Sequence, residues 1–157
     1  MGFDPMASVV SRTIATFFGA GYFPKAPGTF ATLATLPLYL ALRRLSAPVY
    51  LLALGKLIAI GTIASGIMEK EWGDDPSRVV IDEVCGLLVT LISRPKGLRE
   101  IALGTALFRF FDIVKPPPVG IIDKKVKGGI GIMADDIAAG GLAALVLALV
   151  RKKGWLP

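Results

Sequence analysis

Five acidic residues stand inside apolar stretches of this sequence, where charged side chains are uncommon. Burying an unpaired carboxylate costs several kcal/mol, so each acid needs a cation, a basic side chain or water. The chain has no histidine and one cysteine, which excludes imidazole-bound zinc and nucleophiles activated by histidine. Carboxylates without such partners are ligands for hard cations such as Mg²⁺, Mn²⁺ or Ca²⁺. The acids that predict this centre are Asp82, Glu83, Asp112, Asp135 and Asp136.

Basic residues near these acids indicate what such a centre could do. Mg²⁺ bound by a few carboxylates keeps several waters, so it can hold a phosphate oxygen and orient an attacking water. Arg109, Lys115 and Lys127 are the nearest basic residues, and we expect them to bind phosphate. The combination predicts phosphate chemistry, with one carboxylate acting as the base for water.

The alternative is that each acid is neutralised by a basic side chain close to it in the sequence. Arg109 and Lys115 each lie three positions from Asp112, and Arg78 lies four before Asp82, spacings that bring side chains together on a helix. Local pairing explains a single site as well as a metal does. Convergence on one centre better explains three acidic sites that all lie in apolar segments near a glycine or proline link.

A glycine- and proline-rich segment, residues 19–29, is a second candidate for holding phosphate. Its glycines allow close backbone approach, Lys25 offers a charge, and Thr29 opens a helix whose N-terminus favours anions. The pattern is neither a Walker A loop nor a dinucleotide fingerprint, so a plain connecting loop is the alternative. Residues 128–131, which follow a run of lysines, are a similar candidate, with a solvated charge run as the alternative.

The single cysteine, Cys85, lacks the surroundings of a catalytic thiol. A cysteine phosphatase needs a low-pKa thiolate in a phosphate-binding loop, with an arginine shortly after it. Cys85 instead stands in an apolar segment beside two acids, which would raise the pKa of its thiol. We therefore expect Cys85 to be inert.

Helices must position these residues, because the apolar stretches follow one another with short glycine and proline links between them. Residues 48–68 contain one charge, Lys56, and are long enough to span a bilayer. Residues 130–150 reach the same length if two aspartates are tolerated inside. Pro37 predicts either a kink or the first turn of a second helical piece, and turns are expected at 95–97 and 116–118. The expected helices cover residues 8–18, 29–44, 47–71, 75–92, 98–114 and 130–150.

Composition indicates a membrane protein of one domain. The chain of 157 residues is 54% hydrophobic with a mean hydropathy of +0.65, yet carries a formal charge of +6. A hydrophobic and basic chain suits an anionic membrane surface. Basic residues in small clusters do not favour nucleic acid. We predict an all-α, single compact bundle of about five to seven helices over residues 1–157, partly membrane-embedded, with residues 1–6 as a flexible lead-in; the oligomeric state stays open.

Two other classes of function compete with an enzyme. In a small transporter or channel, acids inside the membrane line an ion path, but the repeated halves or paired half-helices of such proteins are not visible in the sequence. In a structural or partner-binding helical membrane protein, the acids would be satisfied ion pairs.

Four sequence blocks, in this order, resemble the phosphatidylglycerophosphatase A family. The first is Gly-x-Gly-x-x-Pro-x-Ala-Pro-Gly-Thr at residues 19–29, and the second is Asp-Pro at 75–76 followed by Ile-Asp-Glu-Val-x-Gly at 81–86. The third is Phe-Arg-x-Phe-Asp-x-x-Lys-Pro-x-Pro at 108–118, and the fourth is Gly-Gly-x-Gly-Ile-Met-x-Asp-Asp-x-x-Ala-Gly at 128–140. The resemblance covers about residues 12 to 145 and is specific because all four blocks occur together.

The resemblance implies a helical protein of the bacterial inner membrane that hydrolyses phosphatidylglycerol phosphate to phosphatidylglycerol and inorganic phosphate. It implies a Mg²⁺ cofactor, an anionic phospholipid substrate and an active site at the cytoplasmic face. The catalytic set that it implies is the five acids named above. Within it, the expected metal ligands are Asp82, Glu83, Asp112 and Asp136, and the expected phosphate-binding residues are Lys25, Thr29, Arg109, Lys115 and Lys127.

Overall fold

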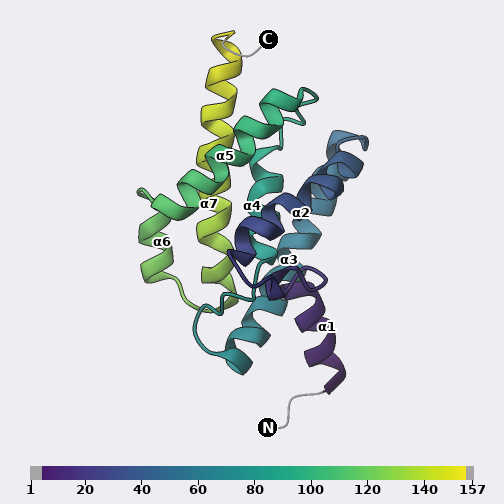
Figure 1. Ribbon diagram of the computed structural model, residues 1–157, viewed down its shortest axis with the longest axis vertical. Helices are drawn as coiled ribbons and strands as arrows, with labels where there is room; N and C mark the ends of the chain where they lie inside the picture. Colours follow the sequence, from purple (N-terminus) through teal and green to yellow (C-terminus); the bar gives the residue numbers. More distant parts are fainter. Residues whose placement is uncertain (1–4, 155–157) are drawn as a thin grey trace.

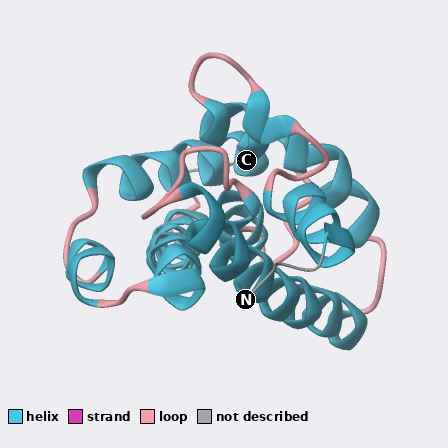
Figure 2. Ribbon diagram, turned by 90° about the horizontal axis from the view of Figure 1, so that it is seen from below, coloured by secondary structure: helices cyan, strands magenta, loops and turns pink. Residues whose placement is uncertain are grey.

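The computed structural model describes residues 5–154, which form a bundle of α-helices with no β-strand in that range (Figures 1 and 2). A single 3₁₀ turn, Ala20–Tyr22, lies in the link between the first two helices. The prediction of an all-α fold is confirmed. The seven α-helices are α1 Pro5–Ala15, α2 Pro27–Leu42, α3 Ala47–Trp72, α4 Ile81–Thr90, α5 Leu98–Val114, α6 Val119–Lys125 and α7 Gly128–Lys152.

Helix α4 is the centre of the bundle. It packs against α2, α3, α5 and α7 (Figure 1). Apart from its first-turn acids and one valine, every residue of α4 is buried. A helix that is apolar on all sides must be enclosed by others. The two acids of α4 therefore lie at the N-terminal end of a helix that is otherwise apolar.

Glycines let α7 cross its neighbours closely. A Cβ on Gly140 would lie 2.3 Å from the backbone oxygen of Gly86 in α4. At the start of α7, a Cβ on Gly129 would lie 2.1 Å from the backbone oxygen of Thr62 in α3. Real Cβ atoms do not approach backbone so closely, so these positions fix the depth at which α7 packs against α3 and α4.

Helices α3 and α7 are the two helices long and apolar enough to cross a membrane among the described residues. They run antiparallel, because the start of α7 contacts the C-terminal part of α3. Their lengths are 26 and 25 residues. They contain the two spans predicted from the sequence at 48–68 and 130–150.

Three expected element boundaries are wrong. Residues 75–80 are irregular, because Asp75 has φ 43° and the Val80 amide donates to the Ala15 carbonyl at 2.8 Å, which ties this segment to α1. Helix α2 begins at Pro27 and continues through Pro37 instead of dividing there. Residues 5 and 6, which the sequence predicted as part of a flexible lead-in, belong to α1, and residues 1–4 of that prediction lie outside the described part.

The prediction for residues 98–114 is confirmed in both bounds. Short helix α6 was not predicted. It follows the proline run at 116–118 and carries Asp123 back towards α7, against which it packs.

Candidate active site

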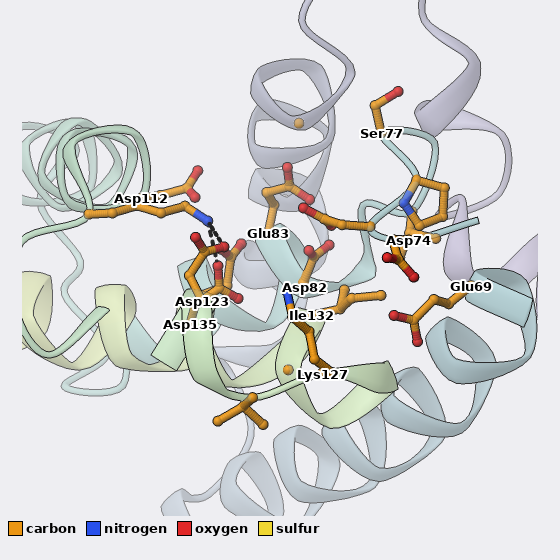
Figure 3. A pocket seen from close by; sticks show the side chains of 18 of the residues that line it. Glu69, Asp74, Ser77, Asp82, Glu83, Asp112, Asp123, Lys127, Ile132 and Asp135 are labelled. Carbon is orange, nitrogen blue, oxygen red and sulfur yellow. Dashed lines mark hydrogen bonds and ion pairs between the residues drawn. The ribbon is translucent and has the colours of Figure 1, made fainter. Parts of the chain in front are cut away.

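One end of the bundle contains a cavity of about 640 Å³ lined by charged side chains. The C-terminal ends of α3 and α5 meet the N-terminal ends of α4 and α7 there, with α6 and the loop before α2 beside them. Nine carboxylates and four basic side chains line it. The labelled acids in Figure 3 lie on several sides of the same space. All five acids expected from the sequence line this cavity.

Three of these acids are close enough to share one ion. Carboxylate oxygens of Asp82, Glu83 and Asp136 all lie within 4.8 Å of one another. One oxygen of each has no hydrogen-bond partner among the described residues and is inaccessible to solvent. Orphaned, buried carboxylate oxygens facing one another are an arrangement that a divalent cation satisfies.

Burial and like charges act on the two acids at the start of α4. Burial, together with the neighbouring carboxylates of Glu83 and Asp136, raises the pKa of Asp82 well above its ordinary value. Burial also raises the pKa of Glu83. Both groups therefore hold protons more readily than exposed carboxyls, unless a cation neutralises the cluster.

Arg109 connects the end of α5 with α2 and α4. Its Nη1 donates to Asp112 Oδ2 at 2.5 Å and lies 3.8 Å from Glu83 Oε1. Its Nη2 donates to Thr29 Oγ1 at 3.3 Å. The Nε atom has no partner within the described residues. Arg109 can therefore neutralise two acids or, through its remaining donors, bind an anion.

Lys115 connects α5, α6 and α7. Its Nζ donates to Asp123 Oδ1 at 2.6 Å and to Asp135 Oδ2 at 2.7 Å, the contacts dashed in Figure 3. Burial disfavours the charge on Lys115, but the hydrogen bonds to the two carboxylates outweigh burial and raise its pKa above the ordinary value. The hydrogen bond from Lys115 lowers the pKa of the Asp123 carboxyl. Lys115 and Asp123 therefore each favour the charged form.

A glycine at the start of α2 makes room for one of the acids. A Cβ on Gly28 would lie 1.9 Å from Glu83 Oε1 and 3.4 Å from Arg109 Nη1. The segment predicted as a phosphate cradle therefore approaches the site through its backbone. Residues 26–28 of that segment line the cavity.

The expected phosphate-binding residues take different places. Arg109, Lys115 and Lys127 line the cavity. Thr29 contacts Arg109 without lining the cavity, and Lys25 is exposed on the loop outside the lining.

Local pairing accounts for part of the site. The Arg109–Asp112 pair is present, but Lys115 pairs with acids of α6 and α7 and not with Asp112. Arg78, four positions before Asp82, lies 5.8 Å from the ring centre of Tyr22, and the ion pairs of the described residues do not include it.

The sequence did not single out four further acids of the lining, nor Ser77. They occur in polar surroundings, where an acid is usually solvated, so only Asp75 of the Asp-Pro block carried any signal. The missed residues are the four acids Glu69, Asp74, Asp75 and Asp123, together with Ser77.

Cys85 is fully buried in α4, and burial, together with nearby Asp136, raises the pKa of its thiol to about 12. A thiol with this pKa is protonated at neutral pH and unreactive. The surroundings agree with the prediction that it is inert.

Comparison with known proteins gives one family. The family model described as phosphatidylglycerophosphatase A matches residues 13–151. Phosphatidylglycerophosphatase A of Escherichia coli is 36% identical over 136 residues, which cover 85% of this chain and 79% of the relative. The protein of the same name from Haemophilus influenzae is 33% identical over 141 residues, covering 88% and 86%. A Bacteroides thetaiotaomicron protein named "Putative phosphatidylinositol-3-phosphatase" is 38% identical over 146 residues, covering 88% and 91%. No solved structure matches the chain.

Proposed function

The chain belongs to the phosphatidylglycerophosphatase A family, and from this membership we propose that it hydrolyses phosphatidylglycerol phosphate to phosphatidylglycerol and inorganic phosphate. Membership confirms the prediction that the chain is an enzyme, a phosphatase. The observation that supports this site for the reaction is the convergence of acids from α4, α5 and α7 on one cavity beside Arg109 and Lys115.

Mg²⁺ is the proposed cofactor, held by Asp82, Glu83 and Asp136 with Asp112 beside them. The orphaned, buried oxygens of that trio fit a divalent cation, and an all-oxygen donor set fits a hard one. When bound, Mg²⁺ supplies polarisation of a phosphate oxygen and neutralises charge in the transition state.

The chain's own side chains would bind and orient the phosphate. Arg109 and Lys115 line the same cavity as the acidic trio and are tied by ion pairs to Asp112 and Asp135. Neutralising the acids frees donors on both cations for phosphate oxygens. Lys127, on the cavity wall, adds a third positive charge.

The reaction breaks the bond between phosphorus and the oxygen of the glycerol headgroup. Water supplies the oxygen that bonds to phosphorus, one of the five carboxylates accepts its proton, and the departing alcohol oxygen takes up a proton. Asp135 is positioned for a proton role because Lys115 fixes its Oδ2 while its Oδ1 has no partner among the described residues.

Association with a membrane is supported by the two long apolar helices. We propose that α3 and α7 span the bacterial inner membrane as part of one domain, with the cavity at the cytoplasmic face and the acyl chains of the substrate remaining in the bilayer. A transporter is a weaker reading, because the acids gather at one end of the bundle instead of following a path through it.

Phosphate release by the purified chain tests this proposal. We expect release from phosphatidylglycerol phosphate in Mg²⁺ and loss of release in EDTA, restored by adding Mg²⁺. Equal rates in both conditions would contradict the metal mechanism. Phosphatidylinositol 3-phosphate is the informative competing substrate, because the name of the Bacteroides relative refers to it. Faster turnover of that lipid would change the proposed substrate headgroup but leave the proposed phosphate hydrolysis unchanged.

A further inference from the structure

The end of the bundle remote from the acidic cavity contains a second pocket, of about 650 Å³, with a different lining. Its residues come from the end of α2 and the turn after α4. We call it the distal basic pocket. It is lined by Arg43, Arg44, Leu45, Ser93, Arg94 and Lys96. The two pockets lie at opposite ends of α2, a helix of 16 residues, and so are separated by about 24 Å.

Charge is distributed very unequally between the two ends. The segments at the distal end, residues 43–46, 91–100 and 151–153, contain eight lysines and arginines but a single acid, Glu100. That acid is already paired, at 3.0 Å, with Arg151. The chain's net positive charge is therefore concentrated at the end that does not carry the acidic cavity.

The cations of the distal basic pocket have no carboxylate partner in the part of the chain described. Arg94 donates to the Leu45 carbonyl at 2.6 Å, and Arg43 donates to the Lys96 carbonyl at 3.2 Å. These contacts hold the two guanidinium groups in place without neutralising them. Arg44 and Lys96 are exposed. Four positive charges around one concavity favour an anion strongly.

Stabilisation of helix ends explains only half of this arrangement. Basic residues near helix C-termini satisfy free carbonyls and complement the helix dipole, which accounts for Arg43 and Arg94. It does not account for the side chains of Arg44 and Lys96, which donate no hydrogen bond to a carbonyl within residues 5–154.

The position of the pocket along α3 indicates the source of the anion. Helix α3 begins directly after the pocket and extends for 26 residues towards the acidic end, about 39 Å, which is close to the thickness of a bilayer with its headgroups. Leu45 is 40% exposed and Leu98, in the same distal segments, is 81% exposed. A pocket of cations flanked by exposed leucines matches the boundary between headgroups and acyl chains.

We propose that the distal basic pocket binds the phosphate of an anionic phospholipid in the leaflet opposite the acidic cavity. The lipid is a bound ligand and not a substrate, because no cluster of acids lies near it in the described residues. This inference depends on insertion in a bilayer and not on which reaction the acidic cavity performs.

The test uses the full chain in detergent micelles, with Arg44→Gln and Lys96→Gln combined in one variant. Within residues 5–154 these side chains make no hydrogen bond or ion pair, so folding should be unaffected, which circular dichroism and the thermal midpoint verify. The control combines Lys70→Gln with Lys125→Gln, which removes the same charge from exposed positions at the other end. The probe is a spin-labelled phosphatidylserine, with phosphatidylcholine as the neutral comparison. The distal variant lacks two headgroup cations, each of which contributes about fivefold to affinity. We therefore expect it to bind the probe on the order of thirtyfold more weakly and the control to match the unmodified chain.

Several results would overturn the proposal. Unchanged binding by the distal variant, or an equal loss in the control, would show that the pocket has no special affinity. Full displacement of the probe by millimolar inorganic phosphate would identify a free-anion site instead of a lipid site. Phosphate release measured on the same samples separates this inference from the proposed function, because the distal variant should keep its activity whether or not it binds the probe.

Discussion

Asp82, Glu83 and Asp136 repel one another when no cation lies between them, since their oxygens are within 4.8 Å and buried. Such a cluster lowers the stability of the folded chain in exchange for a binding site. We therefore expect Asp136→Asn to raise the thermal midpoint in EDTA while abolishing the stabilisation that Mg²⁺ gives. Phosphate release should fall by about a hundredfold or more.

The matched control for this variant is Asp75→Asn, an exposed acid on the rim of the same cavity. Its thermal midpoint should be nearly unchanged in EDTA and should still rise with Mg²⁺. A lower midpoint for Asp136→Asn in EDTA would show that Asp136 is satisfied by the protein alone.

The raised pKa values of Asp82 and Glu83 predict how stability depends on pH. A carboxyl whose folded-state pKa is raised stabilises the fold below its ordinary pKa, and this contribution is lost as pH rises through the folded value. Without a cation, the chain should therefore become less stable between about pH 4 and the raised pKa values. Mg²⁺ should stabilise strongly at about pH 8 and weakly at about pH 5, where protons compete for the same oxygens. Thermal melts at both pH values, with Mg²⁺ and with EDTA, measure this difference; equal Mg²⁺ shifts would contradict it.

At the scale of residues, the sequence predicted which acids lie together but not which acids pair with Arg109 and Lys115. Asp82, Asp112 and Asp136 stood out because apolar neighbours make a charge costly. Asp123 did not, because it stands beside lysines, and its hydrogen bond to Lys115 depends on how α6 folds back after the prolines.

At the scale of elements, the crossing of α4 and α7 determines whether the acids meet. Gly140 contacts the backbone of α4, whereas the next residue, Gly141, has no atom within 4 Å of an added Cβ. Gly140→Ala should push the helices apart, lower the free energy of unfolding by about 1–3 kcal/mol and weaken Mg²⁺ binding. Gly141→Ala should be neutral or stabilise by about 0.5–1 kcal/mol. Chemical denaturation of the adjacent pair measures both, and similar values for the two would contradict the close crossing.

Helices bounded by strong local signals were predictable from the sequence. Residues 98–114 lie between Gly97 and the proline run, and both bounds agree with the structure. Residues 75–80 were predicted as helix because Asp-Pro resembles a helix start. Their conformation is instead set by a hydrogen bond to α1, a tertiary contact that no local pattern contains.

At the scale of the molecule, charges gather at the two ends of the bundle. Between those ends, α2 has no charged residue, α4 has none after its first turn, and α7 has none between Asp136 and Arg151. The sequence predicted the apolar spans and the total charge. The sequence did not predict that net positive charge would be concentrated at one end, because this depends on helices that bring distant segments to the same end. Figure 1 shows this arrangement of the helices.

Spanning predicts that the two ends are accessible from opposite sides of the membrane. Ser46→Cys lies at the distal end and Lys125→Cys at the cavity end, both exposed, while native Cys85 is buried and should not react. In intact spheroplasts, an impermeant maleimide should label Ser46→Cys and should reach Lys125→Cys only after permeabilisation. Labelling of both before permeabilisation would contradict spanning, and the reverse pattern would invert the orientation.

The cavity lining, with nine carboxylates and four basic side chains, also has a kinetic consequence. A doubly charged phosphate monoester is repelled from such a surface, so we expect the proposed cation to bind first and the lipid second. Substrate binding measured by equilibrium partition should then be nearly absent in EDTA and appear with Mg²⁺, even in a variant too slow to turn over. The enzyme would thus bind lipid only when free Mg²⁺ is high enough to occupy the site. In a magnesium-starved cell its rate would fall at the substrate-binding step.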